Sequence, residues 1–189
     1  MTPATLFLGG ARSGKSRCAQ QYAEDLRLDD QVYLATGQVL DAEMQERVAR
    51  HQRDRGRRWR TEEVPFELPE RLLALDAPDR VCLVDCLTMW VSNMLCQEMA
   101  REDVERRCQA LIGSLSRCRC AIVLVGNEVG TGLVPESALG RRFRDVNGEL
   151  NQSVAAVCSN VFWMAAGLPI AAKVDGQAVC QPGSLWRSS

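Results

Sequence analysis

The sequence predicts an α/β fold, in which a mostly parallel central sheet carries helices on both faces. Two observations support this prediction. Short apolar runs alternate along the chain with longer segments of helical periodicity, as in chains that form parallel sheets. The composition, with 46% hydrophobic and 25% charged residues, is that of an ordinary globular protein. With 189 residues the chain can bury a substantial core, so we expect one domain over residues 1–189.

The predicted strands are five short apolar runs bounded by turn residues or by helical segments. They are "ATLFLGG" at 4–10, "QVYLATG" at 31–37, "RVCLVDC" at 80–86, "AIVLVGN" at 121–127 and "NVFWMAA" at 160–166. Between them we expect helices over residues 15–26, 41–54, 86–98, 102–117 and about 138–158. Because ligands of parallel sheets bind at the carboxyl ends of the strands, functional residues should lie there. From about residue 174 the chain turns polar, and we expect it to be loosely ordered.

The overall charge and the N-terminal segment exclude several classes of protein. A formal net charge of −1 gives no general attraction to nucleic acid or anionic membranes, so we expect small-molecule partners and no nucleic acid. The apolar run within "MTPATLFLGG" is too short for a membrane span. A signal peptide would carry a basic segment before its apolar run, and no such segment precedes this one.

The nine cysteines admit more than one interpretation. A disulfide scaffold would need an even number, no Cys-x-x-Cys pair occurs, and a single histidine leaves little for a zinc site. Cys82, Cys86 and Cys120 lie in or beside apolar runs. We therefore expect reduced, buried thiols in a cytoplasmic protein.

The first strand is followed by a stretch that fits the phosphate-binding pattern GxxxxGK[ST] and opens a helix, as the P-loop does. In such a loop the inward-facing amides and the positive end of the helix hold phosphate oxygens. Lys15 is expected to reach the β- and γ-phosphates, and Ser16 to place its hydroxyl on Mg²⁺. The alternative is a structural glycine-rich turn. The residues of the motif are Gly9, Gly10, Ala11, Arg12, Ser13, Gly14, Lys15 and Ser16.

A P-loop requires a carboxylate at the end of a neighbouring strand, and Asp85 ends the run "RVCLVDC". An unpaired charge is costly inside a core, which favours a functional role such as holding Mg²⁺. The alternative is that Asp85 caps the helix that follows, and it could do both.

The run that ends at Asn127 and Glu128 leads through a glycine-containing loop to a charged helix. The arginines of this helix could line a polyanionic site, or form a solvated face or a subunit contact. The segment "NEVG" lacks the NKxD-type element that reads the base in regulatory GTPases, which argues against a molecular switch. The polar residues in question are Arg141, Arg142, Arg144, Asp145 and Asn151.

The only histidine, His51, lies within "RVARHQRDRGRRWR". In a helix over 41–54, capped by Asp41, His51 continues the inward stripe of Met44 and Val48. Such a histidine is by default a core residue. The flanking arginines disfavour the imidazolium, however, and a neutral imidazole beside a phosphate site can act as a nucleophile or a base.

Several of these blocks together resemble one family, the bifunctional adenosylcobinamide kinase / adenosylcobinamide-phosphate guanylyltransferases of coenzyme B12 assembly. The similarity extends over about residues 5 to 173, with the blocks in the same order, and it implies a RecA-like P-loop fold. The blocks are "GGARSGKS", "ATGQVLDAEMQERVARH", "WRTEE", "VDCLTMWVSN" and "NEVGTGLVPESALGRRFRDVNGELNQ".

The resemblance implies two reactions and a role for His51. The kinase would phosphorylate adenosylcobinamide with ATP or GTP, and the transferase would pass GMP from GTP to adenosylcobinamide phosphate through a guanylyl-histidine at His51. Mg²⁺ would be held by Ser16 and Asp85. Further residues implied to hold GTP are Thr36, Gly37, Gln38 and Glu63, with charge on the phosphates offset by Arg50, Arg53 and Arg55.

The resemblance also implies a homo-oligomer, possibly a trimer. Apolar residues of "CLTMWVSNMLC" could serve that contact, although core packing explains them nearly as well. Some members lack the kinase activity, and no residue pattern marks a corrinoid site. Two other functions remain open: a P-loop small-molecule kinase of other specificity, which would not need His51, and a non-catalytic GTP-binding regulator.

Overall fold

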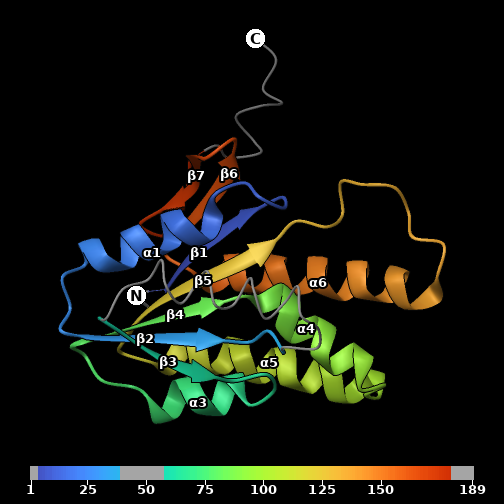
Figure 1. Ribbon diagram of the computed structural model, residues 1–189, viewed down its shortest axis with the longest axis horizontal. Helices are drawn as coiled ribbons and strands as arrows, with labels where there is room; N and C mark the ends of the chain where they lie inside the picture. The colour runs from blue at the N-terminus through green and yellow to red at the C-terminus, as the bar shows by residue number, and fades with distance from the viewer. Residues whose placement is uncertain (1–3, 39–57, 180–189) are drawn as a thin grey trace.

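The computed structural model describes residues 4–38 and 58–179. Within them, eight strands form one sheet in the order β3-β2-β4-β5-β1-β6-β7-β8. The strands from β3 to β6 in this order are parallel, whereas β7 and β8 are antiparallel additions at the edge next to β6 (Figure 1). The strands are β1 (Ala4–Gly9), β2 (Asp30–Ala35), β3 (Trp59–Glu63), β4 (Arg80–Asp85), β5 (Ala121–Asn127), β6 (Asn160–Ala165), β7 (Leu168–Val174) and β8 (Gln177–Ala178).

Five helices of the described residues connect these strands, and both faces of the sheet are covered. They are α1 (Lys15–Asp25), α3 (Leu68–Ala74), α4 (Leu87–Cys96), α5 (Arg101–Arg117) and α6 (Ala138–Val157). The ends of two of them follow from local chemistry. Ser137 caps α6 by accepting a hydrogen bond from the Gly140 amide at 3.0 Å, and α5 carries acidic residues in its first turn and Arg117 in its last.

Alternating strand residues build two separate cores, one on each face. Leu6, Leu34 and Leu124 point to the face covered by α3, α4, α5 and α6. Phe7, from the same strand as Leu6, points to the other face and packs with Ala19 and Ala23 of α1. This alternation follows from the two-residue period of a strand, and the strands therefore read as continuous apolar runs.

The five predicted strands are confirmed, as are the helices that begin at 15 and near 86, 102 and 138. Four elements of the structure have no counterpart among the predicted ones: β3, α3, β7 and β8. β3 and β7 expose most of their side chains, so they carry no apolar run. The helix expected over 41–54 lies outside the described residues. Beyond residue 174, where loose order was expected, Gln177–Ala178 pairs with β7, and residues 180–189 lie outside the described part.

Most apolar side chains of "CLTMWVSNMLC" are buried in the core, so core packing rather than a subunit contact explains them.

Among the described helices, none combines the length and the apolar character needed to cross a bilayer.

Candidate active site

The carboxyl ends of the parallel strands lie at one edge of the sheet (Figure 1), and the predicted phosphate-binding motif and Asp85 follow or end two of these strands. β1 ends at Gly9 and leads through the motif into α1. β4 ends at Asp85, level with Ala35 on β2 and Val125 on β5. β5 ends at Asn127, level with Gly9. The edge therefore brings the phosphate-binding motif beside the candidate carboxylate.

Two glycines of the motif are required by the backbone. Gly14 has φ 87°, a left-handed conformation that residues with a Cβ rarely adopt. Gly9 lies against Met164 of β6, and a Cβ at Gly9 would come within 2.9 Å of the Met164 carbonyl oxygen. The remaining motif residues Gly10, Ala11, Arg12 and Ser13 form the turn between β1 and α1, with Ala11 and Arg12 exposed.

The turn after β6 supports the motif from one side. The Gly167 amide donates a hydrogen bond to the Ser13 carbonyl oxygen at 3.0 Å, and the Gly167 Cα lies near Gly14. On the other side, the Glu128 amide donates to the Gly9 carbonyl oxygen at 3.1 Å. The loop is thus held by both neighbours of β1 in a fixed shape. Such preorganisation lowers the ordering cost of binding phosphate.

Lys15 is buried, with 8% of its surface exposed, and its ammonium closes the loop. Its Nζ donates a hydrogen bond to the Gly10 carbonyl oxygen at 3.0 Å. Burial lowers the pKa of the Lys15 ammonium, while Cys86 and Asp85 act in the opposite direction. A buried ammonium with only part of its charge compensated is suited to an incoming polyanion. Ser16, half-buried in the first turn of α1, lies next to it.

Asp85 is half-buried at the end of β4, and the Tyr33 hydroxyl donates a hydrogen bond to its Oδ2 at 2.8 Å. The N-cap of α4 is Cys86, and no side chain caps that helix. Asp85 therefore does not serve as the helix cap that the sequence left open. The Asp85 carboxylate is near enough to Lys15 to act on it, and it opposes the lowering of the Lys15 pKa by burial.

Thr36 is fully buried and ties the ends of β2 and β4 together. Its hydroxyl donates to the Cys86 carbonyl oxygen at 2.6 Å and accepts from the Cys86 amide at 2.8 Å. Its own carbonyl oxygen accepts from Asn93 Nδ2 at 2.7 Å. Gly37 and Gln38 follow, both half-buried. These bonds make Thr36 a residue that positions the strand ends around Asp85.

Glu63 is exposed at the end of β3, where it is level with Ala35, and Ala35 is level with Asp85. With strands about 4.8 Å apart, the Glu63 and Asp85 backbones are separated by roughly 10 Å across two strand spacings. Glu63 thus shares the edge with the P-loop and Asp85 but lies toward its far end. His51, Arg50, Arg53 and Arg55 lie outside the described residues.

The end of β5 is held by a polar network. The backbone amide of Asn127 donates to Thr88 Oγ1 at 2.7 Å. The backbone carbonyl oxygen of Asn127 accepts from Asn147 Nδ2 at 2.9 Å and from Asn151 Nδ2 at 3.1 Å. Asn151 thus anchors α6 to the sheet, although the sequence suggested it for a polyanionic site. Asn147, which the sequence analysis missed, stands four residues earlier on the same helix face, and this spacing was the available signal.

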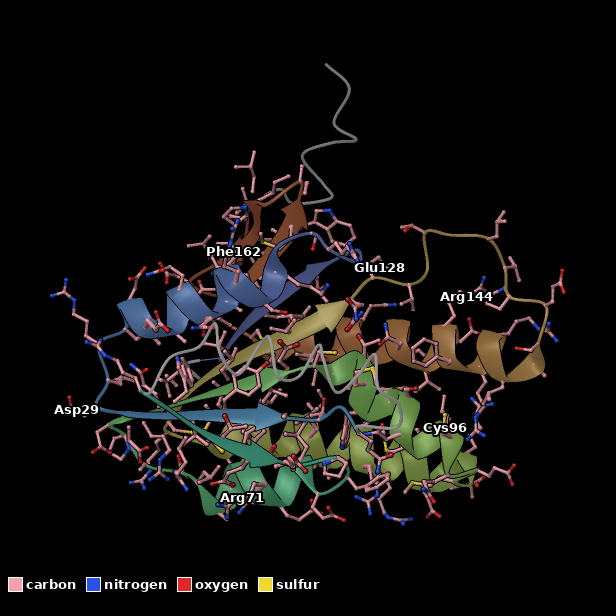
Figure 2. All side chains as sticks on the ribbon, viewed as in Figure 1. Asp29, Arg71, Cys96, Glu128, Arg144 and Phe162 are labelled. Atoms are coloured by element: carbon pink, nitrogen blue, oxygen red, sulfur yellow. The ribbon has the colours of Figure 1, made fainter. Side chains whose placement is uncertain are left out.

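Two arginines near the start of α6 donate hydrogen bonds to backbone carbonyl oxygens. Arg141 donates to the Pro135 and Glu136 carbonyl oxygens, and Arg142 donates to that of Met99. Figure 2 shows Glu128 at the edge of the sheet and Arg144 on α6, where it pairs with Asp145 at 3.4 Å. These contacts favour the structural interpretation of the cluster over a phosphate site.

The fold and the loop define the class of protein. A mostly parallel sheet with the Gly9–Ser16 loop after β1, and with an acidic residue at the end of β4, which is separated from β1 by β5 alone, is that of a P-loop NTPase of the RecA-like type. Solved structures agree on the fold: one described as an ATPase domain covers 94% of this chain and 78% of its own, with TM-score 0.51 at 10% identity. A protein from Pyrococcus horikoshii OT3 covers 95% and 92%, with TM-score 0.55 at 10% identity.

Sequence comparison then gives the family. The model described as "Cobinamide kinase / cobinamide phosphate guanyltransferase" matches residues 5–172. A Pseudomonas aeruginosa protein, "Bifunctional adenosylcobalamin biosynthesis protein CobP", is 44% identical over 169 residues, covering 89% of this chain and 96% of the relative. The Escherichia coli K12 protein "Bifunctional adenosylcobalamin biosynthesis protein CobU" is 38% identical over 180 residues, covering 89% and 98%. The chain belongs to the cobinamide kinase / cobinamide phosphate guanyltransferase family, which confirms the resemblance found in its motifs.

Proposed function

We propose that this chain catalyses both reactions that name its family, as an enzyme of adenosylcobalamin biosynthesis. It phosphorylates adenosylcobinamide, and it transfers GMP from GTP to adenosylcobinamide phosphate. The observation that carries the proposal is the P-loop with buried Lys15, at the same edge of the sheet as Asp85, in a chain that matches the family over residues 5–172.

In the kinase reaction, the substrate hydroxyl oxygen attacks the γ-phosphorus of ATP or GTP. The bond from that phosphorus to the β–γ bridging oxygen breaks, and the nucleoside diphosphate leaves. Lys15 exchanges its bond to the Gly10 carbonyl oxygen for bonds to the β- and γ-phosphate oxygens. The amides of the loop from Gly10 to Lys15 hold the same phosphates, so the chain acts mainly by positioning and charge stabilisation.

Mg²⁺ fits the oxygen ligands at this edge. The Ser16 hydroxyl and the Asp85 carboxylate are the hard donors that this ion prefers, and both border the loop. When bound, Mg²⁺ would neutralise charge on the phosphate oxygens. Tyr33 holds Asp85 Oδ2, which fixes the orientation of the carboxylate.

In the transferase reaction, a ring nitrogen of His51 attacks the α-phosphorus of GTP and pyrophosphate leaves. The resulting N–P bond is then broken when a phosphate oxygen of adenosylcobinamide phosphate attacks, which gives adenosylcobinamide-GDP and restores the imidazole. His51 is proposed for this role because the family resemblance implies a guanylyl-histidine at this place in the chain, and the chain has no other histidine. A covalent intermediate divides a displacement between two polyanions into two easier steps.

The other implied residues have distinct proposed roles. Gly37, Gln38 and Glu63 would contact GTP, and Arg55 would offset phosphate charge. Thr36 would position Cys86 rather than contact GTP, because its hydroxyl already bonds to both the amide and the carbonyl oxygen of Cys86.

We further propose that the enzyme is a homo-oligomer that acts in the cytoplasm. Exposed apolar side chains on β6 and β7 offer a contact surface: Trp163, Leu168, Ile170 and Val174. The cysteines of the described residues are free thiols, in keeping with a reducing compartment.

The experiment compares the two lysines of the chain. Lys173 donates to the Ala155 and Ala156 carbonyl oxygens near the end of α6, away from the P-loop, and so provides a matched control. Each variant is assayed for conversion of adenosylcobinamide with ATP or GTP, and of adenosylcobinamide phosphate with GTP. In Lys15→Ala the KM for the nucleotide should rise about 10- to 150-fold, because charged hydrogen bonds contribute about 1.5–3 kcal/mol. Lys173→Ala should keep both activities.

Unchanged activity in Lys15→Ala would remove the assignment of the P-loop. A wild-type protein that phosphorylates another small molecule but neither corrinoid would indicate a kinase of different specificity. GTP binding without turnover of either substrate would indicate a regulator.

A further inference from the structure

A cluster of thiols lies at the amino-terminal edge of the sheet, opposite the P-loop. Cys118 ends α5 and Cys120 directly precedes β5, while Cys82 lies within β4 and Asp76 in the connection before it. The Cys118 and Cys120 sulfurs and an Asp76 carboxylate oxygen all lie within 4.8 Å of one another. Cys82 belongs to the same buried cluster as Cys118 and Cys120, and the neighbouring Cys120 thiol raises the pKa of the Cys82 thiol. Four potential ligands therefore converge from three segments.

We propose that Cys82, Cys118, Cys120 and Asp76 bind a thiophilic divalent cation, with Zn²⁺ as the expected ion. Three sulfurs and one carboxylate oxygen form a four-ligand set suited to tetrahedral zinc, and thiolates select such ions over Mg²⁺. With Zn–S bonds of about 2.3 Å, ligand atoms of a tetrahedral site lie about 3.7 Å apart. The Cys118, Cys120 and Asp76 ligand atoms, which lie within 4.8 Å of one another, thus need to move by roughly 1 Å or less, whereas the Cys82 sulfur lies outside that group and has to move further to complete the set.

The backbone already holds the ligands in place. Asp76 accepts hydrogen bonds from the Arg119 amide at 2.6 Å and the Cys120 amide at 2.9 Å, which wraps residues 118–120 around the carboxylate. These two amide bonds orient the carboxylate and limit the reorganisation that binding requires. The Cys118 thiol donates a hydrogen bond to the Leu72 carbonyl oxygen at 3.7 Å, and this proton would be released when the thiolate binds the ion.

Charge and access are also compatible with a cation. Three thiolates and a carboxylate around Zn²⁺ would carry an excess of two negative charges, and Arg119 pairs with Asp76 at 3.1 Å while Arg80 lies close enough to act on Cys82. The Cys82 and Cys120 side chains are fully buried, but the Asp76 side chain is 19% exposed. The ion would enter past Asp76. Cys82 is three residues from Asp85 along β4, roughly 10 Å away, so the site is separate from the nucleotide.

The test is a titration of the reduced, full-length, nucleotide-free protein with Co²⁺, followed by displacement with Zn²⁺. One ion per chain should bind and give the visible and thiolate charge-transfer absorption of tetrahedral cobalt, and Zn²⁺ should abolish it. Cys118→Ser should weaken binding by about 100-fold or more, beyond the usual cost of altering residues around the ligands. Cys96→Ser, at an exposed cysteine outside the cluster, should bind as the wild type does.

Thermal melting of each apo variant shows whether it is folded. If Cys118→Ser does not fold, X-ray absorption of the Zn²⁺-loaded wild type decides instead, with three sulfur neighbours expected at about 2.3 Å and one oxygen at about 2.0 Å. No thiolate absorption in the wild type, equal binding by folded Cys118→Ser, or an oxygen-only zinc environment would each overturn the proposal.

Discussion

Lys15 belongs to the P-loop motif in the sequence and is buried in the structure. The chain has 23 basic residues, of which only Lys15 and Lys173 are lysines, and one of the two falls in the P-loop motif. The structure adds what the motif could not give: the ammonium is buried, bonded to Gly10, and influenced by Asp85. Its pKa is lowered by burial, a cost that bound phosphates would offset.

At the same scale, two glycines are predicted to respond to the same substitution in opposite directions. Gly9→Ala should destabilise the protein by about 1–3 kcal/mol, because the new Cβ would meet Met164 of β6 and the Ser13 hydroxyl. Gly113→Ala, in open space on α5, should stabilise it by up to about 1 kcal/mol. Denaturant unfolding measures both. A Gly9→Ala variant as stable as the wild type would show that β1 and β6 are not packed as described.

At the scale of elements, the ladder pairs β2 with β4 as far as Ala35 and Asp85, and just beyond it the Thr36 hydroxyl ties the two chain segments together. Thr36→Val removes the hydroxyl that serves both the amide and the carbonyl oxygen of Cys86. The Cys86 carbonyl oxygen would still accept from the Trp90 amide, so only the Cys86 amide loses its partner. The loss of stability should be about 2 kcal/mol, since one buried group left unpaired costs about 1–3 kcal/mol. Turnover should fall with it, because Asp85 directly precedes Cys86.

The control is Ser116→Ala, which removes an exposed hydroxyl bonded to Ile112 within α5 and should change stability by less than about 0.5 kcal/mol. Equal effects of the two substitutions on thermal unfolding would contradict the role given to Thr36.

At the scale of the molecule, the apolar surface on β6 and β7 predicts self-association. Leu168 is 68% and Ile170 is 53% exposed, and a cluster of exposed apolar side chains of this kind is typical of an interaction surface. Light scattering should give a multiple of the 21.0 kDa chain, three times that mass for a trimer, and the double variant Leu168→Glu/Ile170→Glu should give one chain. A wild-type protein with the mass of a single chain would contradict the proposed self-association.

The sequence predicted the parts of the molecule whose side chains face the core. The runs that became β1, β2, β4, β5 and β6 are apolar because both faces are buried, and the P-loop motif has a local pattern. It did not predict β3 and β7, whose exposed residues leave no periodic signal. The support that Tyr33 gives to Asp85, and Gly167 to Ser13, depends on tertiary neighbours far apart in the chain, so no local pattern could indicate it.

The covalent role of His51 is the central claim, and labelling with GTP tests it most directly. The protein is incubated with α-labelled GTP and Mg²⁺, denatured, and examined for bound label. The wild type should carry label that is lost in acid and stable in base, as for a phosphoramidate, and His51→Ala should carry none, although this variant still binds GTP. Label that persists in His51→Ala, or a wild-type protein that binds GTP and never acquires label, would contradict it.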